Sequence, residues 1–148
     1  IPIFGNGDID SPEKALDYKN RFGVDGIMIG RAAIGYPLIF NEIKHFVQTG
    51  THLPAPTIED RVAVCKKHLH KSFEWKGPKV GIFEMRRHYT NYLKGMPGIK
   101  DYRYKLVTLD TVEEIDAVLD EIVLKYAGYT FEKTPIELIN YHEKCPVT

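Results

Sequence analysis

The sequence has few of the features expected of a secreted, membrane-spanning or metal-binding protein. Its only cysteines, Cys65 and Cys145, form no Cys-x-x-Cys pair, so we interpret both as reduced thiols rather than a disulfide framework. No apolar run is long enough to cross a bilayer, and no signal peptide precedes the first strand-like residues. Among six histidines, His68 and His70 point to different sides of a helix, and no thiol or carboxylate completes a ligand set. We therefore expect a cytoplasmic protein without a metal or a membrane partner.

The chain also lacks net charge, with 20 Lys and Arg against 20 Asp and Glu, but the two signs are segregated. Residues 57–105 carry 12 basic against 5 acidic side chains, whereas residues 106–148 carry 3 against 9. A basic segment suits an RNA partner, because cations neutralise phosphates. It equally suits a solvated face that is partly neutralised by the acidic segment, so charge alone does not decide between the two.

The first 50 residues alternate between short apolar runs, glycine turns and helical patterns. A strand is expected at residues 1–4 and another at 26–29, each running into a glycine turn. Ser11 and Pro12 predict the start of a helix over 12–22, and a second helix is expected over 37–47. This order is typical of parallel β/α units. A chain that opens directly on a strand is interpreted as part of a longer protein.

After a proline-punctuated linker over 51–56, the apolar spacing becomes purely helical. Helices are expected over 57–73, over 80–94 and from Thr111 to about 126, followed by a less regular one from Pro135. No strand is expected after residue 56. The only tryptophan, Trp75, precedes a Gly-Pro turn and is interpreted as an anchor of the helical bundle rather than a base-stacking platform. Cys65 falls on an apolar stripe and is expected in the core.

Two glycine turns at the ends of successive parallel strands suggest a phosphate site. Gly7 and Gly30 have no Cβ, so backbone N–H groups can approach an anion, and Arg31 adds a guanidinium group. Either turn alone is better explained as an ordinary tight turn. Two in register favour a phosphate, although they do not say which molecule carries it.

The helical part mixes cations with aromatic side chains, which suits RNA because rings can stack on unpaired bases. Arg87, Asn91 and Lys94 share one face of the helix expected over 80–94. The predicted RNA-binding residues are Arg86, Arg87, His88, Asn91, Lys94 and Arg103. Packing against Tyr92 is an equally good explanation of His88.

Two separate segments resemble one known family. Residues 1–9 (IPIFGNGDI) and 23–32 (GVDGIMIGRA) are similar to the last two barrel strands of tRNA-dihydrouridine synthases, especially the bacterial DusB type. The resemblance implies a TIM barrel whose FMN phosphate is bound by Asn6, Gly7, Asp8, Gly30 and Arg31. A carboxylate repels a phosphate, so Asp8 is expected to cap the backbone or to bind through its N–H.

Residues 84–98 (EMRRHYTNYLKGMPG) resemble the motif of that family's helical tRNA-binding domain. The resemblance implies the last two β/α units of a TIM barrel over 1–50, a linker over 51–56 and an all-α bundle over 57–148, mostly helical overall. It also implies reduction of a tRNA uridine to dihydrouridine, with FMN as cofactor, NADPH as reductant and a cysteine as acid. That cysteine lies on a barrel loop upstream of Ile1, so no catalytic residue is expected in this chain.

Several expectations follow from the missing barrel strands. The chain alone should be inactive, and its β/α piece should pair with the N-terminal half of the barrel or self-associate. Which tRNA uridine is modified does not follow from the sequence. Two alternatives stay open: a stand-alone RNA-binding or interaction module, and part of another FMN-dependent barrel oxidoreductase.

Overall fold

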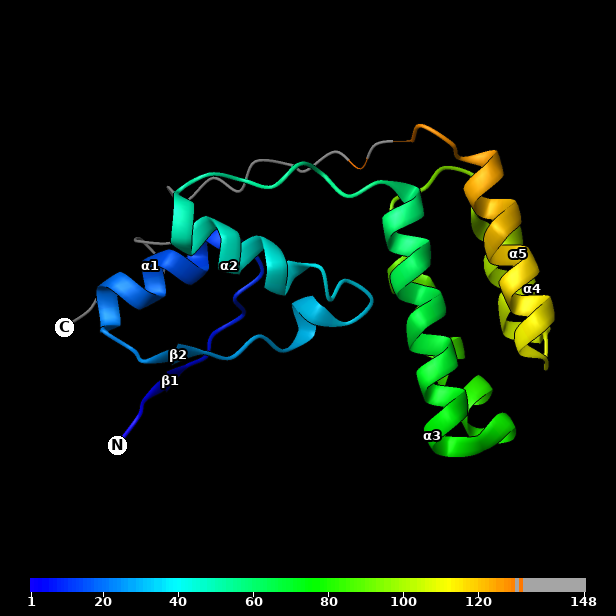
Figure 1. The fold of residues 1–148 in the computed structure, drawn as a ribbon, viewed down its shortest axis with the longest axis horizontal. Helices are drawn as coiled ribbons and strands as arrows, with labels where there is room; N and C mark the ends of the chain where they lie inside the picture. Colours follow the sequence, from blue (N-terminus) through cyan, green and yellow to red (C-terminus); the bar gives the residue numbers. More distant parts are fainter. Residues whose placement is uncertain (130, 132–148) are drawn as a thin grey trace. The chain divides into compact units, whose positions relative to one another are not determined.

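The computed structural model describes residues 1–129 and 131, which fold into two compact units (Figure 1). The first unit comprises residues 1–33 and 37–54, and the second comprises 34–36 with the described residues from 55 onward. The described chain is mostly helical, as expected from the sequence. None of its helices is long and apolar enough to cross a membrane.

The first unit is a two-stranded parallel sheet with two helices. Phe4 pairs with Gly26 and Gly5 with Ile27, so the strands are shorter than the sequence predicts. Helix α1 packs on both strands and helix α2 packs against α1. In order, the elements are β1 (Phe4–Gly5), α1 (Pro12–Phe22), β2 (Gly26–Ile27), a 3-10 turn η1 (Arg31–Ala33) and α2 (Ile39–Thr49).

Local signals set the bounds of α1. The Ser11 hydroxyl accepts a hydrogen bond from the Lys14 N–H at 3.2 Å, and Pro12 occupies the first turn, where its missing N–H costs nothing. Gly23 closes the helix in the left-handed conformation with φ 60°. These are the start and end that the sequence predicts.

Much of the apolar surface of the first unit is uncovered in this chain. Its small core includes Ile9, Ala15 and Val24, whereas Ile3 is 64% and Phe4 69% exposed. Parallel sheets are normally covered on both faces, so the two strands of this chain by itself leave an apolar surface open.

The second unit contains four helical segments around one core. Helix α3 (Ile58–Tyr92) is two helices, because Gly77 has non-helical backbone angles (φ 78°, ψ 170°). Its halves, 58–76 and 78–92, fold back on each other as a hairpin (Figure 1). Helices α4 (Lys100–Thr108) and α5 (Val112–Lys125) complete the unit. Helix α4 was not predicted.

Close packing holds the α3 hairpin together. The Ser72 hydroxyl donates to the Gly81 carbonyl at 3.1 Å, and a Cβ on Gly81 would lie 2.5 Å from the Ser72 carbonyl oxygen. Cys65 is fully buried, as predicted, and burial together with the nearby Asp116 raises the pKa of its thiol to about 12. The helix expected from Pro135 and the second cysteine lie outside the described residues.

Candidate functional site

The turn after β1 is held tightly by the first unit itself. The Tyr18 hydroxyl donates to the Gly7 carbonyl at 3.3 Å, and a Cβ on Gly7 would lie 2.5 Å from that hydroxyl oxygen. Asp8 follows in the left-handed region, at φ 50°, which is uncommon for a residue with a side chain. A side chain at position 7 would therefore displace the Tyr18 ring from its place against this turn, whatever else binds there. Nothing in the sequence pointed to Tyr18.

The turn after β2 is open. A Cβ on Gly30 would meet nothing within 4 Å, and Gly30 is absent from the glycines with positive φ. The chain then forms the η1 turn, in which the Ala33 N–H donates to the Gly30 carbonyl at 3.0 Å. Neither packing nor backbone angle requires glycine at position 30. A ligand that approaches the backbone closely would require it.

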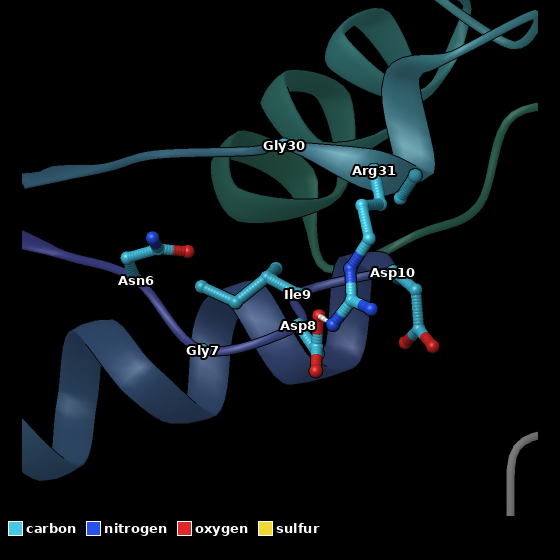
Figure 2. Close-up of a pocket in the computed structure, with 8 residues that line it drawn as sticks. Asn6, Gly7, Asp8, Ile9, Asp10, Gly30 and Arg31 are labelled. Atoms are coloured by element: carbon cyan, nitrogen blue, oxygen red, sulfur yellow. Dashed lines mark hydrogen bonds and ion pairs between the residues drawn. The ribbon is translucent and has the colours of Figure 1, made fainter.

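The two turns lie side by side because the strands that lead into them are parallel neighbours. Both turns line one open pocket, whose volume is about 840 Å³. Figure 2 shows the side chains around it. All five residues predicted to bind the cofactor line it, together with three that the sequence did not single out. The lining residues are Asn6, Gly7, Asp8, Ile9, Asp10, Gly30, Arg31 and Ala32.

An ion pair joins the two turns across the pocket. The Arg31 guanidinium binds the Asp8 carboxylate, and both side chains are largely exposed (Figure 2). Asp10, at the rim, binds Lys14 at 2.7 Å. The Asp8 carboxylate thus orients the guanidinium, and a bound anion would have to share it. Exposed ion pairs are weak, so an incoming phosphate can compete for Arg31.

Helix dipoles contribute little to this pocket. Helix α1 begins at Pro12, four residues beyond Asp8, and Ser11 already caps it. The second turn leads into a three-residue 3-10 turn, and α2 begins only at Ile39. The anion-binding capacity of this pocket therefore rests on backbone N–H groups and Arg31.

Two of the six predicted RNA-binding residues, Arg86 and Arg103, bind carboxylate or carbonyl groups at the two ends of α4. Arg86 Nη2 binds Asp110 Oδ1 at 2.7 Å and reaches the Leu109 carbonyl at 3.4 Å. Arg103 Nη2 donates to the Leu93 carbonyl at 2.9 Å. Both side chains therefore connect helices, a role that the sequence did not reveal.

Of the other four predicted residues, Arg87, His88 and Asn91 lie on the second half of α3, whereas Lys94 lies in the turn that follows its end at Tyr92. Arg87 and Lys94 are exposed, and neither forms an ion pair with any described residue. The Arg87 Nε–H donates to His88 Nε2 at 3.3 Å. Asn91 lies under Gly35, where a Cβ would be 2.3 Å from the Asn91 Cβ. Of the four, Arg87 and Lys94 are the cations most available to a partner.

Some of the basic residues are neutralised by the acidic segment, as the second interpretation of the charge pattern anticipated. Every such pair joins α3 or α4 to α5 or to the loop before it. The pairs are Lys66–Asp120, Arg86–Asp110 and Lys105–Glu121, and His70 also contacts Asp116 at 2.7 Å.

Comparison with known proteins identifies the class to which this fold and pocket belong. The family model "Dihydrouridine synthase (Dus)" matches residues 1–127, so the chain belongs to the dihydrouridine synthase family, whose fold is a TIM barrel. The resemblance found in the sequence is thereby confirmed.

Individual relatives agree with this assignment. The chain is 42% identical over 113 residues to tRNA-dihydrouridine synthase B of Pseudomonas putida, covering 76% of this chain and 34% of the relative. It is 37% identical over 123 residues to a probable tRNA-dihydrouridine synthase 1 of Synechocystis, covering 83% and 34%. A probable tRNA-dihydrouridine synthase of Rickettsia prowazekii is 32% identical over 126 residues, covering 85% and 38%. The chain thus spans about a third of the length of these relatives.

Proposed function

We propose that this chain is the C-terminal part of a tRNA-dihydrouridine synthase that reduces a uridine of tRNA with FMN and NADPH. The observation that carries the proposal is the pocket in which both glycine turns meet beside Arg31. In this assignment β1 and β2 are the last two strands of the barrel, and the second unit is the tRNA-binding bundle.

The residues of the pocket fit the phosphate of FMN. Gly30 leaves open space next to its backbone, and the guanidinium of Arg31 offers paired donors to phosphate oxygens. The Asp8 carboxylate holds that guanidinium in place. When bound, FMN supplies the hydride chemistry, and this chain holds and orients its phosphate end. The acid that protonates the uracil ring belongs to the rest of the enzyme.

Riboflavin gives a direct test, because it has the ring of FMN without the phosphate. We expect the 148-residue chain to bind FMN more tightly than riboflavin in isothermal titration, with inorganic phosphate competing for FMN. Gly30→Val should abolish the difference, because its side chain fills the open space without a clash inside the chain. The matched control is Gln48→Val, an exposed position that does not line the pocket. Equal affinities for the two flavins would refute the phosphate assignment.

For tRNA we assign phosphate contacts to Arg87 and Lys94, since both are exposed and not engaged in ion pairs with described residues. His88 and Asn91 lie between them in sequence, on the second half of α3. Arg86 and Arg103 act through the structure, holding the loops at either end of α4. Binding of a tRNA transcript that weakens steeply with salt is the expected measurement.

The exposed apolar residues of the first unit support a missing partner. We propose that the N-terminal strands of the barrel cover Ile3 and Phe4 in the complete enzyme, and that copies of this chain associate through the same surface when those strands are absent. Light scattering that reports a monomer at high concentration would contradict this.

One alternative keeps a specific observation in its favour. Because Asp8 already pairs with Arg31, the pocket presents no unopposed cation, which suits an RNA-binding module without a flavin. Salt-sensitive tRNA binding together with equal affinity for FMN and riboflavin would favour this alternative.

A further inference from the structure

Trp75 is exposed, contrary to the expectation that it anchors the bundle. It is the only tryptophan of the chain, it lies near the end of the first half of α3, and its exposed fraction is 82%. A tryptophan side chain is large and mostly apolar, so one that projects into water from an otherwise well-packed hairpin suits a surface that binds something.

A groove of about 340 Å³ runs beside this ring. Its lining residues fall at helical spacing on one face of α3, so they form a continuous strip. They are His68, Lys71, Ser72, Trp75 and Lys76. Ser72, which binds the Gly81 carbonyl, places the bottom of the groove at the contact between the two halves of the hairpin.

The polar side chains of the groove are two lysines, one histidine and one serine. Lys71 binds Glu74 at 2.6 Å and Lys76 binds Glu84, but both pairs are exposed, and each ammonium group has further N–H donors. Burial, followed by the positive charges of Lys76 and Arg87, lowers the pKa of His68. Its Nδ1 is 3.2 Å from the Tyr92 hydroxyl.

The neighbouring imidazole completes this environment. The ring of His88 lies 4.9 Å from that of His68, centroid to centroid, and burial, His68 and Arg87 lower the pKa of His88. The Nδ1 of His88 is buried without a hydrogen-bond partner among the described residues. Both imidazoles are therefore neutral at neutral pH, in a region where cations outweigh the two carboxylates that pair with them.

We propose that the groove beside Trp75 binds one unpaired nucleotide of RNA, with the base stacked on the indole ring and its phosphate directed to Lys71 and Lys76. An exposed aromatic ring next to cations is the arrangement that binds single-stranded nucleic acid. The groove is at the small end of ligand sites, so it suits one nucleotide rather than a peptide segment. The inference rests on the proposed function, since it takes RNA as the partner. It adds a subsite that none of the six residues predicted from the sequence lines, although His88 and Arg87 lie close to His68.

Fluorescence tests the proposal directly, because all tryptophan emission of this chain comes from Trp75. We expect a tRNA transcript and an unstructured uridine oligonucleotide to quench this emission on binding, and a fully paired RNA duplex to bind without quenching. Replacement of a stacked ring costs about 1–3 kcal/mol per base, so Trp75→Ala should weaken binding of the oligonucleotide roughly five- to 150-fold.

Tyr104→Ala is the matched control, because Tyr104 is an aromatic residue of the same unit that is 71% exposed and lies outside the groove. Weakening by Trp75→Ala but not by Tyr104→Ala supports the proposal. Binding of tRNA without quenching, or equal effects of the two variants, overturns it and leaves the proposed function intact. A chain that binds neither tRNA nor the oligonucleotide, for instance because the groove holds a protein segment, overturns the inference and also the tRNA part of the proposed function.

Discussion

Arg86 and Arg87 are neighbours in sequence but should fail in different ways when replaced by alanine. Arg86 connects α3 to the loop before α5 through Asp110 and the Leu109 carbonyl, and its side chain is 30% exposed. Arg87 points outward and contacts only the adjacent His88 among the described polar partners. The first change should therefore affect stability, and the second should affect binding of tRNA.

The size of the Arg86 effect can be worked out from its contacts. A hydrogen bond to a charged group contributes about 1.5–3 kcal/mol, but an exposed ion pair contributes only about 0.2–1 kcal/mol. Asp110 is 83% exposed, and the 3.4 Å contact with the Leu109 carbonyl is long, so the range for an exposed ion pair applies to Arg86. Arg86→Ala should thus cost about 1 kcal/mol, or roughly 4–8 °C in Tm for a unit of this size. Arg87→Ala should stay within about 0.5 kcal/mol of the parent chain.

Thermal unfolding followed by circular dichroism measures the first effect, and hydrogen exchange of the α3 amides localises it to the second unit. The affinity for a tRNA transcript at several salt concentrations measures the effect of Arg87→Ala. Loss of one phosphate contact in this variant should reduce the slope of log affinity against log salt concentration by about 1. Equal Tm values for the two variants, with a reduced salt slope for Arg86→Ala, would refute the division of roles.

Three further outcomes are expected. The pKa values of His68 and His88 are lowered in the folded chain, so the stability that the neutral imidazoles contribute is fully present above their unfolded pKa of about 6.5 and is lost as pH falls below it. Tm measured against pH should show this loss, and the variant with both histidines replaced by glutamine should have a flatter profile of Tm against pH. Gly81→Ala should destabilise the hairpin by about 1–3 kcal/mol in urea unfolding, because its Cβ meets the Ser72 carbonyl, whereas Gly30→Ala should be neutral. The isolated chain with FMN, NADPH and tRNA should leave uridine unchanged in nucleoside chromatography, and any turnover would contradict the assignment of the acid to the rest of the enzyme.

Features encoded locally were predictable from the sequence. Thr57 and Asp60 form a capping box at the start of α3, with the Asp60 N–H donating to the Thr57 hydroxyl at 3.2 Å, and Thr111 caps α5 in the same way. The Gly-Pro turn that divides α3 was also evident, because proline cannot continue a helix and glycine allows positive φ. Such signals act within a few residues, so they can be recognised in the sequence without knowing the tertiary structure.

Features that depend on packing were not predictable. Helix α4 has nine residues and buries only Leu106. Its few apolar residues are separated by charged ones, so the sequence shows no clear helical pattern there. A helix this short depends on tertiary contacts for its stability. Trp75 is exposed because the hairpin turns back just beyond it. The exposure of the Trp75 ring and the pairing of Arg86 with Asp110 both depend on how the second half of α3 packs against its neighbours. A residue pattern does not specify that packing.

The separation of charge along the chain is best explained as two effects rather than one. Lys66 and Lys105 pair with α5, and Arg86 pairs with Asp110 in the loop before it, so part of the basic excess serves to join the helices of the second unit. The cations left for a partner are those without ion pairs among the described residues, including Arg87 on the second half of α3 and Lys94 in the turn after it. A net count of +7 for residues 57–105 therefore overstates the charge that these residues offer to a partner, and the base stacking on Trp75 proposed above would add to it.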